Sequence, residues 1–117
     1  MANPNIVTVT DIRGKTAVAS VTNTAAALVE NAAASGKVFK LNSLIISNID
    51  GANNSEITID IYRNSVAYHL AKTMTVPADA SIDVLSKSIY LEEGDALRVT
   101  AAHNSRLQAV CSYEEIL

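Results

Sequence analysis

Hydrophobic and polar residues alternate along much of the chain. In the segment SEITIDIYR, residues 55–63, Ile57, Ile59 and Ile61 share one side, and their polar or aromatic neighbours share the other. A period of two indicates a β-strand that is half buried against a core. The segment KVFKLNSLIISNI, residues 37–49, is longer and denser in hydrophobic residues. Its composition predicts a central strand that is covered on both faces near its end.

A second alternating segment follows residue 64. SVAYHLAK, residues 65–72, sets Val66, Tyr68 and Leu70 opposite smaller or polar residues. The pattern indicates another strand, with these three side chains facing the core. The dipeptide NS at positions 64–65 has the length of a tight connection, so the two segments are expected to form a β-hairpin.

Five further segments are expected to be strands: KTMTV, SIDVLS, SIYLE, ALRVTAA and RLQAVCSYEE. Turn-forming residues separate them, such as the DG and NN pairs of IDGANNSE. Pro77 fixes φ and has no amide hydrogen, so VPADAS should be a loop. Short strands separated by turn signals predict an all-β fold. We expect a single antiparallel β-sandwich, jelly-roll-like, with about eight strands.

Residues 23–36 are open to two interpretations. Several alanines behind an N-cap at Asn23 or Thr24 favour a helix. Such a helix would have no polar stripe, and most of its apolar side chains would be methyl groups. Leu28 and Val29, flanked by small residues, equally suit a short strand. We favour a short strand at 27–30 and a loop at 31–36.

The N-terminus also alternates, in NIVTVTDIRG and TAVASVT. We expect residues 1–12 to be either an assembly arm or the first strand, and residues 13–117 to form the sandwich. The arm hypothesis rests on Ile6, Val7 and Val9, which follow a proline-containing start. Such an arm would add a strand to a neighbouring sheet through backbone hydrogen bonds at its edge.

Composition narrows the class of protein. A length of 117 residues suits one domain. The net charge of −3 gives no electrostatic footprint for nucleic acid. No apolar run approaches the roughly 20 residues that cross a bilayer, and the N-terminus lacks the pattern of a signal peptide. We therefore expect neither a nucleic-acid nor a membrane partner.

The chain has one cysteine, Cys111. A single cysteine excludes an intrachain disulfide and fits synthesis in a reducing cytoplasm. A free cysteine of this kind is typically a small core residue.

Three carboxylates surround a glycine in YLEEGDALRV: Glu92, Glu93 and Asp95 lie beside Gly94. We interpret Glu93, Gly94 and Asp95 as a structural hairpin turn between two strands. Gly94 would supply the positive φ, and Asp95 would bind the backbone of the turn. A glycosidase pair needs two carboxylates that face each other across a cleft, which adjacent turn residues do not provide.

The other candidate chemistry is weaker. IDGANNSEITID lacks the acidic ligands of a calcium loop. His69 and His103 are far apart in sequence and have no ligand partner at metal-binding spacing. No G-x-S-x-G or glycine-rich phosphate loop occurs. We assign no catalytic, metal-binding or cofactor-binding residues, and we expect no cofactor and no enzyme activity.

The succession of segments resembles a known family. SLIISNIDG, ITIDIY, VPADA and IYLEEGDALRVTA, within residues 37–115, are similar to segments of small β-sandwich virion structural proteins of tailed bacteriophages. LEEGDALRV also resembles the L-x-x-G-D-x-V turn of trimeric jelly-roll domains. The first 36 residues lie outside the resemblance, which assigns no catalytic residues.

The resemblance implies a role in the virion after synthesis in the host cytoplasm. Capsid decoration in many copies is the favoured role, and a neck, tail or fibre-attachment protein is the alternative. The partners would be major capsid or neck and tail proteins and further copies of the chain. A carbohydrate-binding module for host adhesion stays open, although such sites need stacking aromatics. The chain has four tyrosines for this purpose, Tyr62, Tyr68, Tyr90 and Tyr113, and no tryptophan. A hydrolase with an unfamiliar site is the remaining alternative.

Overall fold

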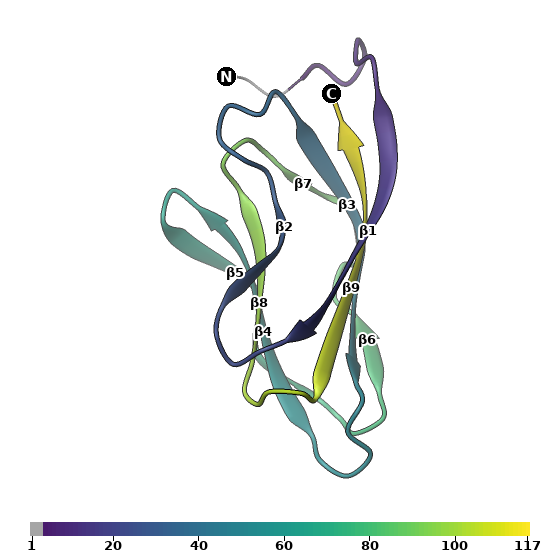
Figure 1. Ribbon diagram of the computed structural model, residues 1–117, viewed down its shortest axis with the longest axis vertical. Helices are drawn as coiled ribbons and strands as arrows, with labels where there is room; N and C mark the ends of the chain where they lie inside the picture. The colour runs from purple at the N-terminus through teal and green to yellow at the C-terminus, as the bar shows by residue number, and fades with distance from the viewer. Residues whose placement is uncertain (1–3) are drawn as a thin grey trace.

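The computed structural model describes residues 4–117 of the chain, and these form an all-β sandwich (Figure 1). Every strand pairing is antiparallel, as the alternation predicted. None of the described residues belongs to a helix long and apolar enough to span a membrane. The strands are β1 (Ile12–Val21), β2 (Ala26–Glu30), β3 (Val38–Asn48), β4 (Ser55–Arg63), β5 (Val66–Val76), β6 (Ser81–Asp83), β7 (Ile89–Leu91), β8 (Ala96–Ala101) and β9 (Leu107–Ile116).

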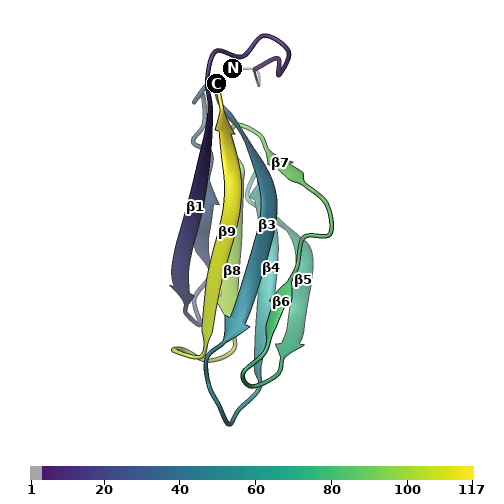
Figure 2. The same ribbon diagram turned by 90° about the vertical axis from the view of Figure 1, so that its right-hand side faces the viewer.

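The strands form two sheets. One has the order β1-β9-β3-β6, with β7 pairing to another part of β3, and the other has the order β2-β8-β4-β5. Figure 2 shows β1, β9 and β3 side by side in front of β8 and β4. β6 and β7 pair with the two halves of the same strand. Counted as one interrupted strand, they account for the difference between the eight strands expected and the nine found within residues 4–117.

The core fills the space between the sheets. Aliphatic side chains from both inner faces are fully buried, as expected for a chain without tryptophan. The largest of them are Leu41, Leu44, Ile46, Ile57, Ile59, Leu91, Leu97 and Leu107. Cys111 is also buried among them, which confirms its assignment as a core residue.

The predicted hairpin joins β4 to β5. Asn64 and Ser65 have φ values of 52° and 61°. Two consecutive positive φ values are typical of a type I′ turn, whose twist matches that of the flanking strands. The loop after β5 was also predicted, because Pro77 occupies a turn between β5 and β6.

β5 differs from expectation in how its side chains are covered. Val66, Tyr68 and Leu70 are exposed, and Ala71 packs against the core instead. The pairing with β4 shifts register so that Leu70 has no directly opposite partner. Tyr68 lies opposite Ile61 and so shares the face of the core residues of β4, but it is left exposed. Beyond the bulge, Ala71 lies opposite Ile59 and packs inward. The segment KTMTV is not a separate strand, because it forms the second half of β5.

β3 also differs from expectation near its end. It lies inside its sheet, but Leu44 and Ile46 are buried while Ile45, between them, is exposed. Only the inner face of this part of β3 is therefore covered. Hydrophobic density alone did not distinguish a covered outer face from an apolar outer face in contact with solvent.

The first third of the chain confirms one interpretation and corrects another. Residues 26–30 form strand β2, with a loop after it, so the strand interpretation of residues 23–36 is confirmed and the helix is wrong. Residues 4–11 contain turns and bends, and β1 begins at Ile12. Among the described residues, NIVTVT is therefore not the first strand of the sandwich. The alternation in TAVASVT belongs to β1.

Candidate assembly site

The N-terminal segment, residues 4–11, lies beside the C-terminus at one end of the sandwich (Figure 1). Ile6 is 54% exposed and Val7 is 86% exposed, while Val9 is half buried. Exposing two aliphatic side chains on adjacent residues is unfavourable in water unless another surface covers them. The structure thus places two of the three expected arm residues, Ile6 and Val7, in contact with solvent.

Hydrogen bonds join the last two residues of this segment to the C-terminal residue of the chain. The amides of Thr10 and Asp11 both donate to the carbonyl of Leu117, at 2.9 Å each, and the amide of Leu117 donates to Asp11. Before Thr10, the described hydrogen bonds are local: the Thr8 amide donates to the Asn5 carbonyl, and the Val7 amide to the Asn5 side chain. A local turn can open without breaking the ladder that begins at Thr10.

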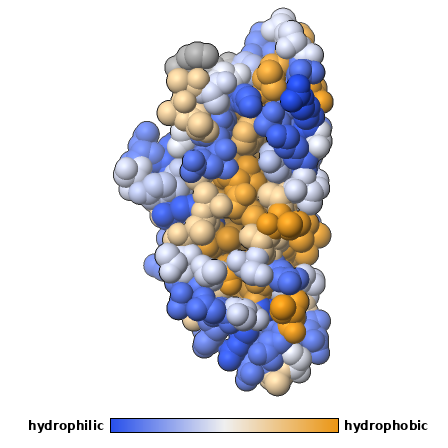
Figure 3. Space-filling model, viewed as in Figure 1, coloured by the Kyte–Doolittle hydropathy of each residue, from blue (hydrophilic) through white to orange (hydrophobic). Residues whose placement is uncertain are grey.

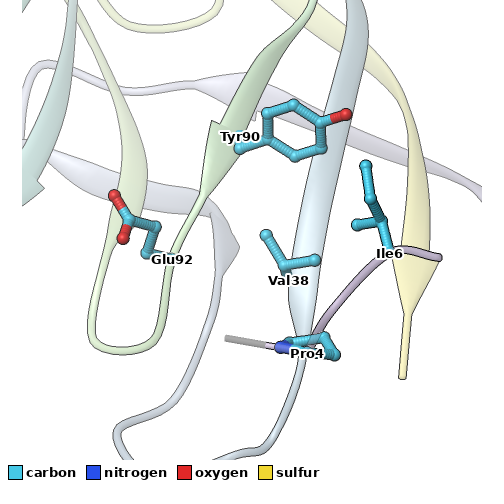
Figure 4. Close-up of a pocket in the computed structure, with 5 residues that line it drawn as sticks. All are labelled: Pro4, Ile6, Val38, Tyr90 and Glu92. Carbon is cyan, nitrogen blue, oxygen red and sulfur yellow. The ribbon is translucent and has the colours of Figure 1, made fainter. Parts of the chain in front are cut away.

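A shallow apolar pocket of about 310 Å³ lies under the segment. Pro4 and Ile6 form one side, and Val38 at the start of β3 and Tyr90 on β7 form the other (Figure 4). Glu92 also lines the pocket, but its carboxylate points away from the other four side chains (Figure 4). The N-terminal segment thus forms one wall of the pocket, and that wall would be removed if the segment moved.

The edge strands of the two sheets, β1 and β2, lie on the same side of the sandwich (Figure 1). Figure 3 shows this side, with hydrophobic residues down its middle that reach the right-hand edge at mid-height, and mostly hydrophilic residues along the left-hand margin and at the lower end. Ala17 on β1 and Leu28 on β2 are half buried against the core here. β1 pairs with β9 from Ile12 to Val21 without a register shift. Its other edge is a ten-residue template for an added strand.

The turn at residues 92–95 is not the hairpin that the sequence predicted. β7, before it, pairs with β3, whereas β8, after it, pairs with β2 and β4 in the other sheet. The turn therefore carries the chain from one sheet to the other. Gly94 has a φ of 86°, a conformation that favours glycine, and the Asp95 amide donates to the Glu92 carbonyl at 3.0 Å.

Asp95 is buried, with 1% of its surface exposed, although the sequence suggested a solvated turn. Its carboxylate accepts from Arg63 Nε at 2.7 Å and from the Glu92 amide at 2.9 Å. The hydrogen bond from Arg63 to Asp95 is the main reason that the pKa of the Arg63 guanidinium is raised. Arg63 Nη2 also donates to the Glu92 carboxylate at 2.8 Å. These contacts fix the crossing between the sheets.

The neighbouring carboxylate, Glu93, has a similar structural role. Its Oε2 accepts from the Gly36 amide at 2.7 Å. Asn31, which is fully buried, accepts from the Gly94 amide and donates from its own amide to the Asp95 carbonyl. The loop after β2 and the turn after β7 are thus joined. Asn31 carries no sequence signal that would have revealed this contact.

The side chain of Asp50 accepts hydrogen bonds from the backbone of its own loop, residues 50–54. The Asp50 carboxylate accepts from the amides of Ala52 and Asn53, at 2.8 and 3.1 Å. These hydrogen bonds, led by that from Ala52, lower the pKa of Asp50. Arg106 Nε lies 3.4 Å from the same carboxylate. Within residues 4–117, no cluster of three or more His, Cys, Asp or Glu side chains is arranged to hold a metal ion.

The remaining reactive groups lie apart. Burial raises the pKa of the Cys111 thiol to about 11, so the thiol is protonated at neutral pH and poorly nucleophilic. His69 is exposed on β5, and His103 is exposed in the turn between β8 and β9. The described groups therefore do not form a nucleophile and base within one site.

The outer face of the β1-β9-β3 sheet exposes aliphatic side chains. Alternation alone did not reveal that they lie side by side. The register places Val18, Val110 and Ile45 directly opposite one another on the three strands. They are 70%, 36% and 38% exposed. Sequence could have identified each as an outward residue of its strand, but only the strand order brings them together.

Comparison with protein-family models and with curated proteins gave no match. Among solved structures, the chain is similar to a protein of Bacillus endospore appendages, described as disulfide-linked pili. The TM-score is 0.53 at 15% identity, over 90% of this chain and 85% of that chain. It also matches a pentameric capsid protein isolated from metagenomic phage sequences, with a TM-score of 0.45 at 16% identity, over 85% of this chain and 59% of that one. The first similarity shows a shared fold, and the second is too low to support an argument.

Proposed function

We propose that the protein is a non-enzymatic structural component of a bacteriophage virion that decorates the capsid surface in many copies. The observation that carries the proposal is the N-terminal segment, which exposes Ile6 and Val7 and whose described bonds to the sandwich begin at Thr10. The resemblance of residues 37–115 to phage sandwiches supports the virion role. The fold shared with a spore-appendage pilus protein supports a structural role.

The N-terminal segment would act as an assembly arm. Residues 5–10, NIVTVT, have the alternation of a strand but no strand partner within the described chain. Opening the local turn at Asn5–Thr8 would let them pair with the edge of a neighbouring sheet. Such pairing would cover Ile6 and Val7 and supply the missing backbone hydrogen bonds.

When many copies decorate one particle, the affinity of each single contact can be low. When copies also contact one another, the attachments to the particle act together, so a short arm of six residues can suffice. The major capsid protein is the proposed partner. A neck, tail or fibre-attachment protein would use the same arm on a different part of the particle.

Deletion of residues 1–9 tests the arm. The deletion keeps Thr10 and Asp11 and therefore the hydrogen bonds to Leu117. We expect binding to undecorated capsids of the virus that encodes the chain to weaken by about tenfold or more, because each copy loses an attachment. Co-sedimentation measures the number of copies bound, and thermal unfolding checks that the sandwich is intact.

Two point variants make the test sharper. Ile6→Ser with Val7→Ser keeps the length of the arm and removes its exposed aliphatic surface, so it should also weaken binding. Val66→Ser makes the same kind of change at an exposed valine of β5 and should leave binding unchanged. Capsid binding that survives the deletion of residues 1–9 would show that the arm does not attach the protein.

A specific observation also favours the adhesion alternative. Tyr68 on β5 and Tyr90 on β7 are both exposed, and together with Arg63 they line one open pocket of about 280 Å³. Exposed aromatic faces suit the apolar side of a sugar ring. The other two tyrosines are occupied: Arg98 lies 3.8 Å from the centre of the Tyr62 ring, and Tyr113 packs against Phe39.

Glycan-array binding distinguishes this alternative. An adhesion module would bind defined glycans and lose that binding on Tyr68→Ala or Tyr90→Ala, whereas Tyr62→Ala would serve as the control. Absence of glycan binding together with capsid binding would favour decoration.

A further inference from the structure

Among the edge strands of residues 4–117, β1 is both long and regular. It runs for ten residues and pairs with β9 without a register shift. At the other edge of its sheet, β6 and β7 have three residues each. In the other sheet, β2 has five residues and a register shift, and β5 has two register shifts against β4. Short or bulged edges resist the addition of a strand, whereas a long regular edge accepts one.

The second half of β1 is an uncharged edge. Arg13 and Lys15 lie near the start of the strand, and residues 16–21 carry no charge. Val18 is 70% exposed, and Ala19 is also exposed. Among the described strands, β1 pairs with β9 alone, so its outer edge has no partner strand. A further strand could therefore add to this half through backbone hydrogen bonds.

The side chains of this half are arranged symmetrically about Val18. The segment TAVAS, residues 16–20, has a hydroxyl residue at each end, an alanine next to each, and the valine at its centre. Two antiparallel strands related by a two-fold axis present their residues to each other in reverse order. A second β1 centred on Val18 would therefore place Val18 opposite Val18. Thr16 would lie opposite Ser20, and Ala17 opposite Ala19.

We propose that β1 pairs with β1 of a second copy of the chain, antiparallel and centred on Val18. The two five-stranded sheets then join into one continuous sheet across a two-fold axis. The proposal adds a contact between copies to the proposed function. It concerns the chain alone, and it leaves the N-terminal segment free to bind a particle.

Symmetry favours a second copy as the partner. A two-fold interface must complement itself, and in this register each side chain meets one of its own kind. Valine against valine covers β-branched surface that a single chain exposes. The hydroxyls of Thr16 and Ser20 both donate and accept, so they can pair across the strands. Alternate residues of an edge strand direct both backbone groups outward, so pairing residues 15–21 with their copy would form about six to eight backbone hydrogen bonds.

The nearby charges do not oppose this contact. Lys15 would lie opposite Val21, so the two copies of Lys15 would be about 20 Å apart along the strands. Exposed charges at that distance are largely screened at physiological salt. On β2, Glu30 aligns with Ala96 and so shares the outer face of the four-stranded sheet with Arg98, away from the joined strands. Asp83, on β6, lies at the opposite edge of the five-stranded sheet.

The same contact would cover part of the open side of the sandwich. Figure 3 looks onto this side, where hydrophobic residues run down the middle. Ala17 on β1 and Leu28 on β2 are only half buried there. Joining the two β1 strands brings this side of one copy against the same side of the other. A contact built on one strand is smaller than a standard interface, so we expect a dissociation constant in the micromolar range.

A charge swap at Val18 tests the contact. Val18→Lys places two like charges directly opposite each other, so association, measured by sedimentation equilibrium, should weaken by about tenfold or more. Val18→Glu alone should have the same effect. An equimolar mixture of the two variants should associate again, because each lysine then faces a glutamate. Thermal unfolding should change little in either variant, because Val18 is exposed.

Val110→Lys is the matched control. It puts the same charge on the same face, but on β9, one strand away from the contact, and should leave association intact. A wild-type chain that is monomeric at high micromolar concentration, or an oligomer that Val18→Lys leaves intact, would overturn the proposal. Association that is lost on deletion of residues 1–9 would also overturn it, because the N-terminal segment would then be the strand that binds the edge.

Disulfide cross-linking tests the register. On oxidation by copper–phenanthroline, Val18→Cys should link to itself, because the two side chains lie directly opposite each other. Thr16→Cys should link to Ser20→Cys and not to itself, and Thr16→Cys that links only to itself would overturn the register. The native Cys111 is buried and should not take part.

Capsid co-sedimentation is scored separately from association. Monomers that bind capsids would contradict this inference alone. A dimer that ignores capsids would contradict only the proposed decoration.

Discussion

The outer faces of the two sheets differ in how they meet water. On the four-stranded sheet, Asp60 and Arg98 lie opposite each other on β4 and β8 and are joined at 2.8 Å, and Arg98 also covers the ring of Tyr62. On the five-stranded sheet, the corresponding position is the row of Val18, Val110 and Ile45, which is left open.

This difference indicates different uses of the two faces. The Asp60–Arg98 pair satisfies its charges within the chain and leaves little for a partner to gain. The row of Val18, Val110 and Ile45 offers apolar area, and covering that area would be favourable. The five-stranded sheet would therefore gain more from being covered than the four-stranded sheet.

Removing core and outer-face side chains from the same strand gives the largest expected contrast. Leu44 is fully buried, and Ile45, its neighbour, is exposed on the outer face. Leu44→Ala should lower the free energy of unfolding by about 3 kcal/mol, because it leaves a cavity. Ile45→Ala should lower it by less than about 1 kcal/mol in a chain that cannot associate. Urea unfolding measures both, and equal losses would contradict the assignment of Ile45 to an open face.

Breaking the ion pairs of the two sheets should give a similar but smaller contrast. Asp60 is buried, so Arg98→Met leaves an uncompensated carboxylate and should cost about 3 kcal/mol. The Lys40–Glu114 pair is more exposed and longer, so Lys40→Met should cost less than about 0.5 kcal/mol. Adding Asp60→Asn to Arg98→Met should recover part of the loss. Thermal or urea unfolding checks each value.

Acid should lower the stability of the chain through Glu115. Burial raises the pKa of Glu115, but its ion pairs with Lys15 and Lys37 outweigh that effect and lower the pKa overall. A lowered pKa in the folded state stabilises the chain above the unfolded pKa of about 4.3, and this stability is lost as the pH falls through the folded value.

We therefore expect the free energy of unfolding to fall below about pH 4.5, and Glu115→Gln should make the decline shallower. Urea unfolding as a function of pH measures both. A decline that is as steep in Glu115→Gln as in the wild type would contradict this assignment.

The smallest perturbation tests the inward and outward alternation of the five-stranded sheet. Burial raises the pKa of Cys111 to about 11. The native thiol should therefore resist iodoacetamide at neutral pH and react only after unfolding. Val18→Cys on the outer face should react at once in the dissociated chain. Rapid labelling of native Cys111 would show that the sandwich opens easily.

Alternation predicted the strands well where one face is buried. It identified β4 and the hairpin to β5, because the period and the turn residues there agree with the final fold. The short strand β2 was favoured for another reason, the small residues that flank Leu28 and Val29. It was misleading at residues 5–10, where the same alternation occurs without a strand partner in the described chain.

Three features that depend on long-range contacts were not predictable from sequence: the crossing at Gly94, the burial of Asp95 and the exposed aliphatic row of the five-stranded sheet. The turn at Gly94 was predicted to be a hairpin, because turn-forming residues do not indicate which sheet the next strand joins. Asp95 is buried by contacts with Arg63, far away in the sequence. The row of Val18, Val110 and Ile45 exists because β9 lies between β1 and β3, and strand order is a long-range property.

The most direct test of the structural role is the mass of the purified chain in solution, alone and after mixing with undecorated capsids. We predict a discrete oligomer that co-sediments with capsids at a fixed number of copies per particle. A monomer that stays in solution when capsids are pelleted would contradict the account.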